Sequence, residues 1–161
     1  MQEGLLHFIS GVQEGLLHRC NFMLKTQLRQ LGLAKRQQLT ADKLQIFSLA
    51  ISQIFFQTFS LEDVSSLHIY LPILKHNEIN TWFIIRKIWQ HYPQITLVTS
   101  KTNLPQQTME SYILAANTTI IENRWHIPEP VNATHFAEEN LEMMLLPLLG
   151  FDREGHRVGY G

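Results

Sequence analysis

The sequence predicts an α/β domain whose strands form a mainly parallel sheet. Along its 161 residues, stretches with apolar residues at helical spacing alternate with short apolar runs of strand length. Two parallel strands need a long crossover connection, usually a helix, so this alternation is typical of a layered α/β domain. The length is sufficient for one hydrophobic core that removes roughly two thirds of the unfolded chain's surface from water.

Two helices are expected in the first part of the chain. Leu24, Leu28 and Leu31 recur at helical spacing after Met23. Thr40 is a suitable N-cap for a second helix, because its hydroxyl can accept a hydrogen bond from a backbone N–H of the first turn. The phenylalanines of this second helix, Phe47, Phe55, Phe56 and Phe59, are expected in the core.

Strands and one further helix follow. Residues 67–71 predict a strand that ends at Pro72. Asn80 or Thr81 can cap a helix that should stop before Tyr92-Pro93, because a residue that precedes proline is disfavoured in the α conformation. Further strands are predicted at 95–99, 109–114 and 142–146, and Met143 and Met144 of the last strand are expected in the core.

The composition excludes several classes of function. A net charge of −1 gives no general attraction to nucleic acid or to acidic membranes. No apolar run approaches the roughly 18 residues that a membrane-spanning helix needs, and the start of the chain is not basic as in a signal peptide. Cys20 is the only cysteine, so no intrachain disulfide can form. We therefore expect a cytoplasmic protein that binds neither nucleic acid nor membranes, and we expect it to be a monomer.

The first 22 residues differ from the rest, because Gln-Glu-Gly-Leu-Leu-His occurs at 2–7 and again at 13–18. Two copies are too few for a solenoid, which needs about three or more repeats. We interpret residues 1–22 as an N-terminal extension, or as translated upstream sequence with the natural start at Met23. An amphipathic docking helix is the functional alternative. The ligand-binding domain is expected to comprise residues 23–161.

Ligands of parallel sheets gather outside the carboxyl ends of the strands, where two polar loops are expected here, at 75–78 and 151–161. In the second loop, Gly155, Gly159 and Gly161 can take positive φ and present successive backbone N–H groups to a phosphate. Arg157 adds a planar, permanently charged group that matches phosphate oxygens. The alternative is a plain type I turn from Asp152 to Gly155, with Asp first and Gly fourth.

Residues 147–161 read Pro-x-x-Gly-Phe-Asp-x-x-Gly-x-Arg-x-Gly-x-Gly, which resembles the signature of the 5-formyltetrahydrofolate cyclo-ligase family. Three other segments agree with the family in order and spacing. They are the Lys-x-x-x-Arg pair Lys25 and Arg29, the Glu-Ile-x-Thr motif from Glu78 to Thr81, and the segment from Trp125 to Pro130. The resemblance covers residues 23–161 and implies a three-layer α/β/α sandwich.

By this resemblance, the chain is an enzyme that uses ATP and Mg²⁺ to cyclise 5-formyltetrahydrofolate to 5,10-methenyltetrahydrofolate. Phosphoryl transfer needs positioning and charge neutralisation more than a protein nucleophile, and Arg157 is implied as the catalytic cation. The implied ATP-binding residues are Lys25, Arg29, Gly155, Arg157, Val158, Gly159, Tyr160 and Gly161. The implied folate-binding residues are Glu78, Trp125 and Phe151.

The family pattern continues after the equivalent of Gly161 with another glycine, paired aromatic residues and an Asp, then a helix and a strand. None of these follows Gly161 in this sequence. We therefore expect a C-terminally truncated member whose last fold elements are missing and whose metal-binding Asp lies beyond Gly161. Two functions stay open: a cyclo-ligase, and a truncated protein that binds folate or nucleotide without turnover.

Overall fold

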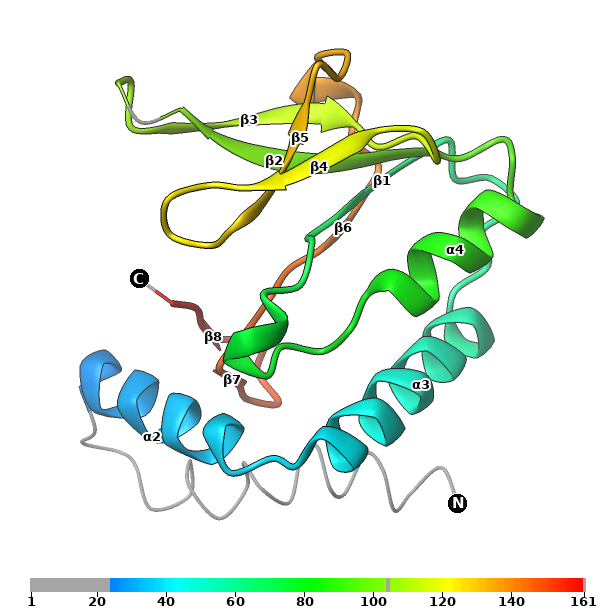
Figure 1. Ribbon diagram of the computed structural model, residues 1–161. Helices are drawn as coiled ribbons and strands as arrows, with labels where there is room; N and C mark the ends of the chain where they lie inside the picture. Colours follow the sequence, from blue (N-terminus) through cyan, green and yellow to red (C-terminus); the bar gives the residue numbers. More distant parts are fainter. Residues whose placement is uncertain (1–23, 104, 161) are drawn as a thin grey trace. The chain divides into compact units, whose positions relative to one another are not determined.

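The computed structural model describes residues 24–103 and 105–160 (Figure 1). The repeat at 2–18 and Gly161 lie outside the described residues. The chain divides into two compact units. One unit is Thr40–Leu146, and the other combines residues before Thr40 with the C-terminal segment from Pro147.

Thr40–Leu146 contains a four-stranded sheet in the order β3-β2-β1-β6. The strands are β1 (Ser66–Ile69), β2 (Thr96–Asn103), β3 (Thr108–Ile113) and β6 (Met143–Leu145). Strand β1 runs parallel to both β2 and β6, whereas β3 is antiparallel to β2. The predicted α/β class with a mainly parallel sheet is therefore confirmed.

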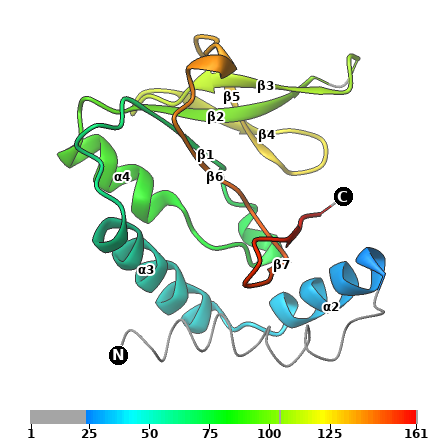
Figure 2. The same ribbon diagram turned by 180° about the vertical axis from the view of Figure 1, so that it is seen from behind.

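Helices α3 (Ala41–Thr58) and α4 (Trp82–His91) lie on the same side of this sheet (Figures 1 and 2). Thr40 caps α3 as predicted, since its Oγ1 accepts a hydrogen bond from the Lys43 backbone N–H at 3.3 Å. At the start of α4, Asn80 Oδ1 accepts from the Trp82 N–H at 3.1 Å, while the Thr81 hydroxyl donates to the Tyr70 carbonyl. Among residues 24–103 and 105–160, no helix is long and apolar enough to cross a membrane.

The core of this unit lies between the sheet and the two helices. Leu67 and Ile69 of β1 are fully buried and belong to one cluster with Phe55 of α3 and Ile85 and Ile88 of α4. Apolar side chains on one face of the central strand therefore hold the helices in place.

Two of the predicted core residues are exposed instead. Phe59 and Met144 are each 49% exposed. Phe59 is the C-cap residue after the last turn of α3 and has an extended backbone, so the helical spacing does not place its side chain on the buried face. Met144 lies opposite His68 in the β-ladder, on the other side of the sheet from Leu67 and Ile69.

A hairpin of β4 (Thr119–Glu122) and β5 (Pro128–Val131) was not predicted. Pro128 and Pro130 carry no N–H and normally argue against a strand, which is why the sequence pattern missed β5. The buried carboxylate of Glu129 accepts a hydrogen bond from the Thr102 N–H at 3.0 Å and so attaches the hairpin to β2. Two short 3₁₀ helices, η1 (Leu74–His76) and η2 (Glu138–Asn140), complete the connections.

The second unit contains α2 (Lys25–Gln37), β7 (Gly150–Phe151) and β8 (Arg157–Val158). β7 and β8 pair antiparallel, with Gly150 opposite Val158, and they lie beside α2 (Figure 1). We call residues 147–160 the glycine-rich segment. The predicted polar loop after the last parallel strand is therefore a small hairpin.

His68 of β1 is a buried titratable group, only 6% exposed. Its Nε2 lies 2.6 Å from the Ser100 hydroxyl of β2, and its Nδ1 is buried without a hydrogen-bond partner among the described residues. Burial lowers the pKa of His68, and the carboxylate of Glu138 opposes this effect only in part. The folded protein therefore favours the neutral ring.

The free energy of unfolding should fall as the pH drops below about 6.5, the ordinary pKa of histidine, because the unfolded chain then binds a proton that the folded chain resists. His68→Gln keeps a side-chain amide near Ser100 but cannot titrate, so it should show a smaller loss of stability between pH 7.5 and 5.5. Urea unfolding at both pH values measures this loss, with the exposed His76→Gln as control. A loss in His68→Gln equal to that of the wild type would show that His68 has no part in it.

Candidate functional site

The first part of the candidate site is the pairing of α2 with the glycine-rich segment. Leu149 N–H donates to the Val158 carbonyl at 2.8 Å, and Asp152 N–H donates to the His156 carbonyl at 3.0 Å. These bonds close a short hairpin whose two ends, near Leu148 and Tyr160, approach α2. Residues that are more than 100 positions apart in the sequence thus come together.

Gly32 permits the close approach of α2 to this segment. A Cβ atom at Gly32 would lie 2.8 Å from the Leu149 carbonyl oxygen and 3.0 Å from the Leu149 Cβ. The first distance is too short for any real contact, and the Leu149 carbonyl could move away only together with the backbone of the segment. A glycine inside a helix lowers the stability of the helix by about 1 kcal/mol relative to alanine. The close contact explains why α2 carries one.

Two arginines of α2 bind the glycine-rich segment directly. Arg29 Nε donates to the Gly159 carbonyl at 3.1 Å. Arg36 donates to the Leu148 carbonyl at 2.6 Å and also to the Tyr160 hydroxyl. Sequence analysis assigned Arg29 to the nucleotide site but gave Arg36 no role of its own. Its spacing was a usable signal, because Lys25, Arg29, Gly32 and Arg36 follow one another at intervals of four, three and four residues along one helix face.

Lys25 and Arg157 have a different environment from Arg29 and Arg36. Both are exposed, and within the described part of the chain neither side chain makes a hydrogen bond or an ion pair. Arg157 lies in β8, the strand that leads to Gly159. These two cations are therefore available to an anionic ligand without first breaking a contact.

The predicted turn from Asp152 to Gly155 is present, and Gly155 has the positive φ expected of it, 86°. The Asp152 carboxylate accepts hydrogen bonds from the backbone N–H groups of Glu154 and His156, each at 2.9 Å. The chain's own carboxylate therefore occupies the two backbone N–H groups on either side of Gly155. Gly159 does not have positive φ, and Gly161 lies outside the described residues.

This turn also affects the carboxyl group itself. Desolvation acts to raise the pKa of Asp152, but hydrogen bonds from the His156 ring and from the backbone of His156 and Glu154 lower it below its ordinary value. Ligand atoms of Asp152, Glu154 and His156 lie within 4.8 Å of one another. The hydrogen bonds of the turn explain this grouping, and the Glu154 and His156 side chains are exposed, so we assign no metal site to it.

Glu78, the residue expected to bind folate, follows β1 and η1 in Thr40–Leu146. It is 3% exposed, so it is a buried side chain and not a loop glutamate surrounded by water. Its Oε2 accepts a hydrogen bond from the Ile73 N–H at 2.7 Å. Asn77, with a φ of 52°, turns the chain so that Glu78 points back into the loop. The carboxylate thus has a structural partner, which fixes where it lies.

The aromatic residues expected at the site are partly exposed. Trp125 is 42% exposed in the turn between β4 and β5, and the Arg124 guanidinium lies over its ring, 4.1 Å from the centroid. Phe151 and Tyr160 of the glycine-rich segment are 41% and 39% exposed. Aromatic rings that are partly exposed can stack on a planar ligand.

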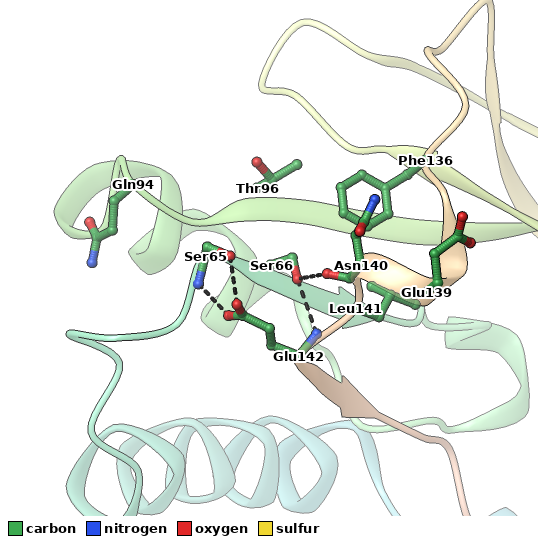
Figure 3. Close-up of a pocket in the computed structure, with 9 residues that line it drawn as sticks. All are labelled: Ser65, Ser66, Gln94, Thr96, Phe136, Glu139, Asn140, Leu141 and Glu142. Carbon is green, nitrogen blue, oxygen red and sulfur yellow. Dashed lines mark hydrogen bonds between the residues drawn. The ribbon is translucent and has the colours of Figure 1, made fainter.

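A polar pocket of about 580 Å³ lies elsewhere, at the amino ends of β1 and β2 (Figure 3). The Glu142 carboxylate accepts hydrogen bonds from the backbone and hydroxyl of Ser65, which lower the pKa of Glu142. The Ser66 hydroxyl donates to the Asn140 carbonyl and accepts from the Glu142 N–H. Because these groups bind one another, we interpret them as the contacts that hold β6 against β1.

Comparison with known proteins identifies a family and a fold. The sequence model of the 5-formyltetrahydrofolate cyclo-ligase family matches residues 22–161. The NMR structure of Aquifex aeolicus 5,10-methenyltetrahydrofolate synthetase superposes with a TM-score of 0.73 at 22% sequence identity, covering 86% of this chain and 68% of that one. The corresponding synthetase of Mycoplasma pneumoniae gives a TM-score of 0.63 at 21% identity, covering 86% of this chain and 73% of that one. A search of curated proteins found no significant match. The two structures show that the fold is shared.

Gly32→Ala should loosen the glycine-rich segment even though alanine favours the helix. The new methyl group would displace the Leu149 carbonyl, and the bonds from Arg29 and Arg36 would lengthen. We expect faster amide hydrogen exchange in residues 148–158 than in the wild type. Gln30→Ala, an exposed position of the same helix, is the matched control and should leave this exchange unchanged. Equal exchange in the two variants would contradict the close-contact role of Gly32.

Proposed function

Because the chain belongs to the 5-formyltetrahydrofolate cyclo-ligase family, a family of enzymes, we propose that it cyclises 5-formyltetrahydrofolate to 5,10-methenyltetrahydrofolate, with conversion of ATP to ADP and phosphate. The observation that carries this proposal is the attachment of the glycine-rich segment to the basic face of α2. This attachment brings the two family motifs that contain cations into one compact unit. One motif contains Lys25 and Arg29, and the other is the glycine-rich segment with Arg157.

The proposed chemistry has two steps. The formyl oxygen attacks the γ-phosphorus of ATP, and the bond to ADP breaks. The N10 nitrogen of the folate then attacks the formyl carbon, the carbon–oxygen bond breaks, and phosphate leaves as N10 loses its proton. The formyl oxygen is a poor leaving group until it is phosphorylated. ATP therefore supplies the driving force, and the protein has to hold the reacting groups in line.

The cations of the α2 unit suit the phosphate side of this reaction. Lys25 and Arg157 can contact phosphate oxygens without losing another partner among the described residues. Arg29 uses its Nε for the Gly159 carbonyl, and this bond holds the guanidinium beside the segment. Arg157 is proposed to neutralise charge that develops on the transferred phosphoryl group. Val158 and Tyr160, with the backbone of Gly155, Gly159 and Gly161, would line the same nucleotide site.

Mg²⁺ would accompany ATP, since a divalent cation bridges phosphate oxygens and offsets their charge. Asp152 is the carboxylate of the glycine-rich segment that the family motif contains. Its oxygens accept hydrogen bonds from the turn that it forms. We therefore give Asp152 the role of shaping the turn rather than that of binding the metal.

Glu78 is proposed to bind the pterin ring of the folate. A pterin presents adjacent N–H donors, and a carboxylate can accept two charge-assisted hydrogen bonds from them. Burial and the bond from Ile73 hold the Glu78 carboxylate in one place, which limits the entropy that binding would cost. Trp125 and Phe151 are proposed to stack on the planar parts of the ligand. We further propose that residues 23–161 form the ligand-binding domain and that the protein acts as a cytoplasmic monomer.

The test is to mix the full chain with 5-formyltetrahydrofolate, Mg²⁺ and ATP and to follow the methenyl product by its absorbance. We expect product only when ATP is present, and Arg157→Gln should lower the turnover number on the order of 100-fold or more. Binding of both ligands without product would favour a folate- and nucleotide-binding protein instead. If the chain binds neither ligand, both functions are contradicted.

Glu78→Gln should weaken folate binding by about 1.5–3 kcal/mol and affect ATP binding much less, because the amide must turn a donor toward one of the pterin N–H groups. The amide oxygen can still accept from the Ile73 N–H, so the loop should keep its conformation. Calorimetric titration with each ligand measures the two affinities, and the exposed Glu62→Gln is the control. The assignment is wrong if ATP affinity falls while folate affinity stays the same.

A further inference from the structure

We propose that Arg36 is a positioning residue for the phosphate-binding segment. It holds together the two ends of the β7–β8 hairpin and fastens both to α2. No motif of the sequence analysis includes Arg36. The inference rests on the proposed function, because it assigns a role in the same ATP site.

The contacts of Arg36 reach both ends of the hairpin. One terminal nitrogen donates to the Leu148 carbonyl at 2.6 Å, two residues before β7 begins. The other terminal nitrogen donates to the Tyr160 hydroxyl, two residues after β8 ends. The guanidinium carbon also lies 5.3 Å from the centre of the Tyr160 ring, within the range of a cation–π contact.

This arrangement requires an arginine. The planar guanidinium directs two separate nitrogens at two acceptors at once and presents a flat face to an aromatic ring. A lysine ammonium is a single point charge on a flexible chain and would satisfy one acceptor at the expense of the other. Arg36→Lys should therefore behave as a loss of the contact although it keeps the charge.

Arg36 differs in role from the other cations of this unit. Its terminal nitrogens are used by the protein, whereas Lys25 and Arg157 make no hydrogen bond or ion pair in the described part of the chain. Arg157 belongs to β8. The residue before it, His156, donates its N–H to the Asp152 carboxylate, and two residues after it the Gly159 carbonyl accepts from Arg29. Arg36 then binds Tyr160 at the end of the hairpin. Fixing Leu148 and Tyr160 therefore fixes the strand that carries Arg157.

The test compares wild type, Arg36→Lys, Arg36→Gln and Arg86→Gln as full chains. Arg86 is an exposed arginine of α4, so its variant controls for loss of one positive charge. The readouts are the affinity for ATP with Mg²⁺, the affinity for 5-formyltetrahydrofolate, and amide exchange without ligand. Both Arg36 variants should bind ATP about tenfold more weakly, the effect expected when a hydrogen bond to a charged group is lost. Folate affinity should change little, and amides 148–158 should exchange faster while those of β1 and β2 keep their rates.

Tyr160→Phe adds a milder variant that keeps the ring and removes one acceptor. Its exchange rates should lie between those of wild type and Arg36→Gln. If Arg36→Lys keeps the wild-type ATP affinity and exchange, Arg36 acts only through its charge and the proposal is overturned. The same conclusion follows if Arg36→Gln matches Arg86→Gln in both readouts. A wild-type chain that binds no ATP contradicts the proposed function itself, whereas normal wild-type binding with unaffected variants contradicts only the role of Arg36.

Discussion

Gly32 and Leu149 approach so closely that a single added methyl group would meet a backbone carbonyl oxygen at 2.8 Å. The candidate phosphate site depends on this approach. It lets the arginines on either side of Gly32 reach backbone carbonyls of the glycine-rich segment, Arg29 at Gly159 and Arg36 at Leu148. Hydrogen bonds from charged donors are stronger than neutral ones, so a hairpin with two residues in each strand becomes fixed to the helix. Lys25 and Arg157 are thereby held in one unit, where we propose that they bind an anionic ligand.

In the folate part of the proposed site, the protein likewise holds the ligand-binding group in place before the ligand binds. Glu78 is placed by burial and by the Ile73 N–H, and its loop follows the carboxyl end of the central strand β1. That strand is held between parallel neighbours and by the apolar cluster around Leu67 and Ile69. The position of β1 in the sheet therefore places the Glu78 loop beyond the carboxyl end of a parallel strand. Ligands of parallel sheets generally bind at this edge.

Local signals predicted much of this structure. Four features depend only on neighbouring residues, so the sequence alone could reveal them. They are the alternation of helices and strands, the Thr40 cap, the end of α4 before Tyr92 and the turn at Asp152. The contact of Arg36 with Leu148 joins residues 112 positions apart, and no local pattern encodes such a partner. Strand β5 was missed because proline normally argues against a strand and is tolerated only at sheet edges. The hydrogen bonds from the Glu154 and His156 N–H groups to the Asp152 carboxylate were not predicted, because the turn pattern alone does not show where that side chain points.

The central claim is that α2 and the glycine-rich segment form one nucleotide-phosphate site. Its most direct test is amide hydrogen exchange of the full chain with and without ATP and Mg²⁺, followed by mass spectrometry of peptides from the whole sequence. The account predicts that ATP slows exchange in residues 25–37 and 147–160 together, since the ligand would bridge cations on both. Protection of only one of these segments, or of neither while ATP is bound elsewhere, would contradict it.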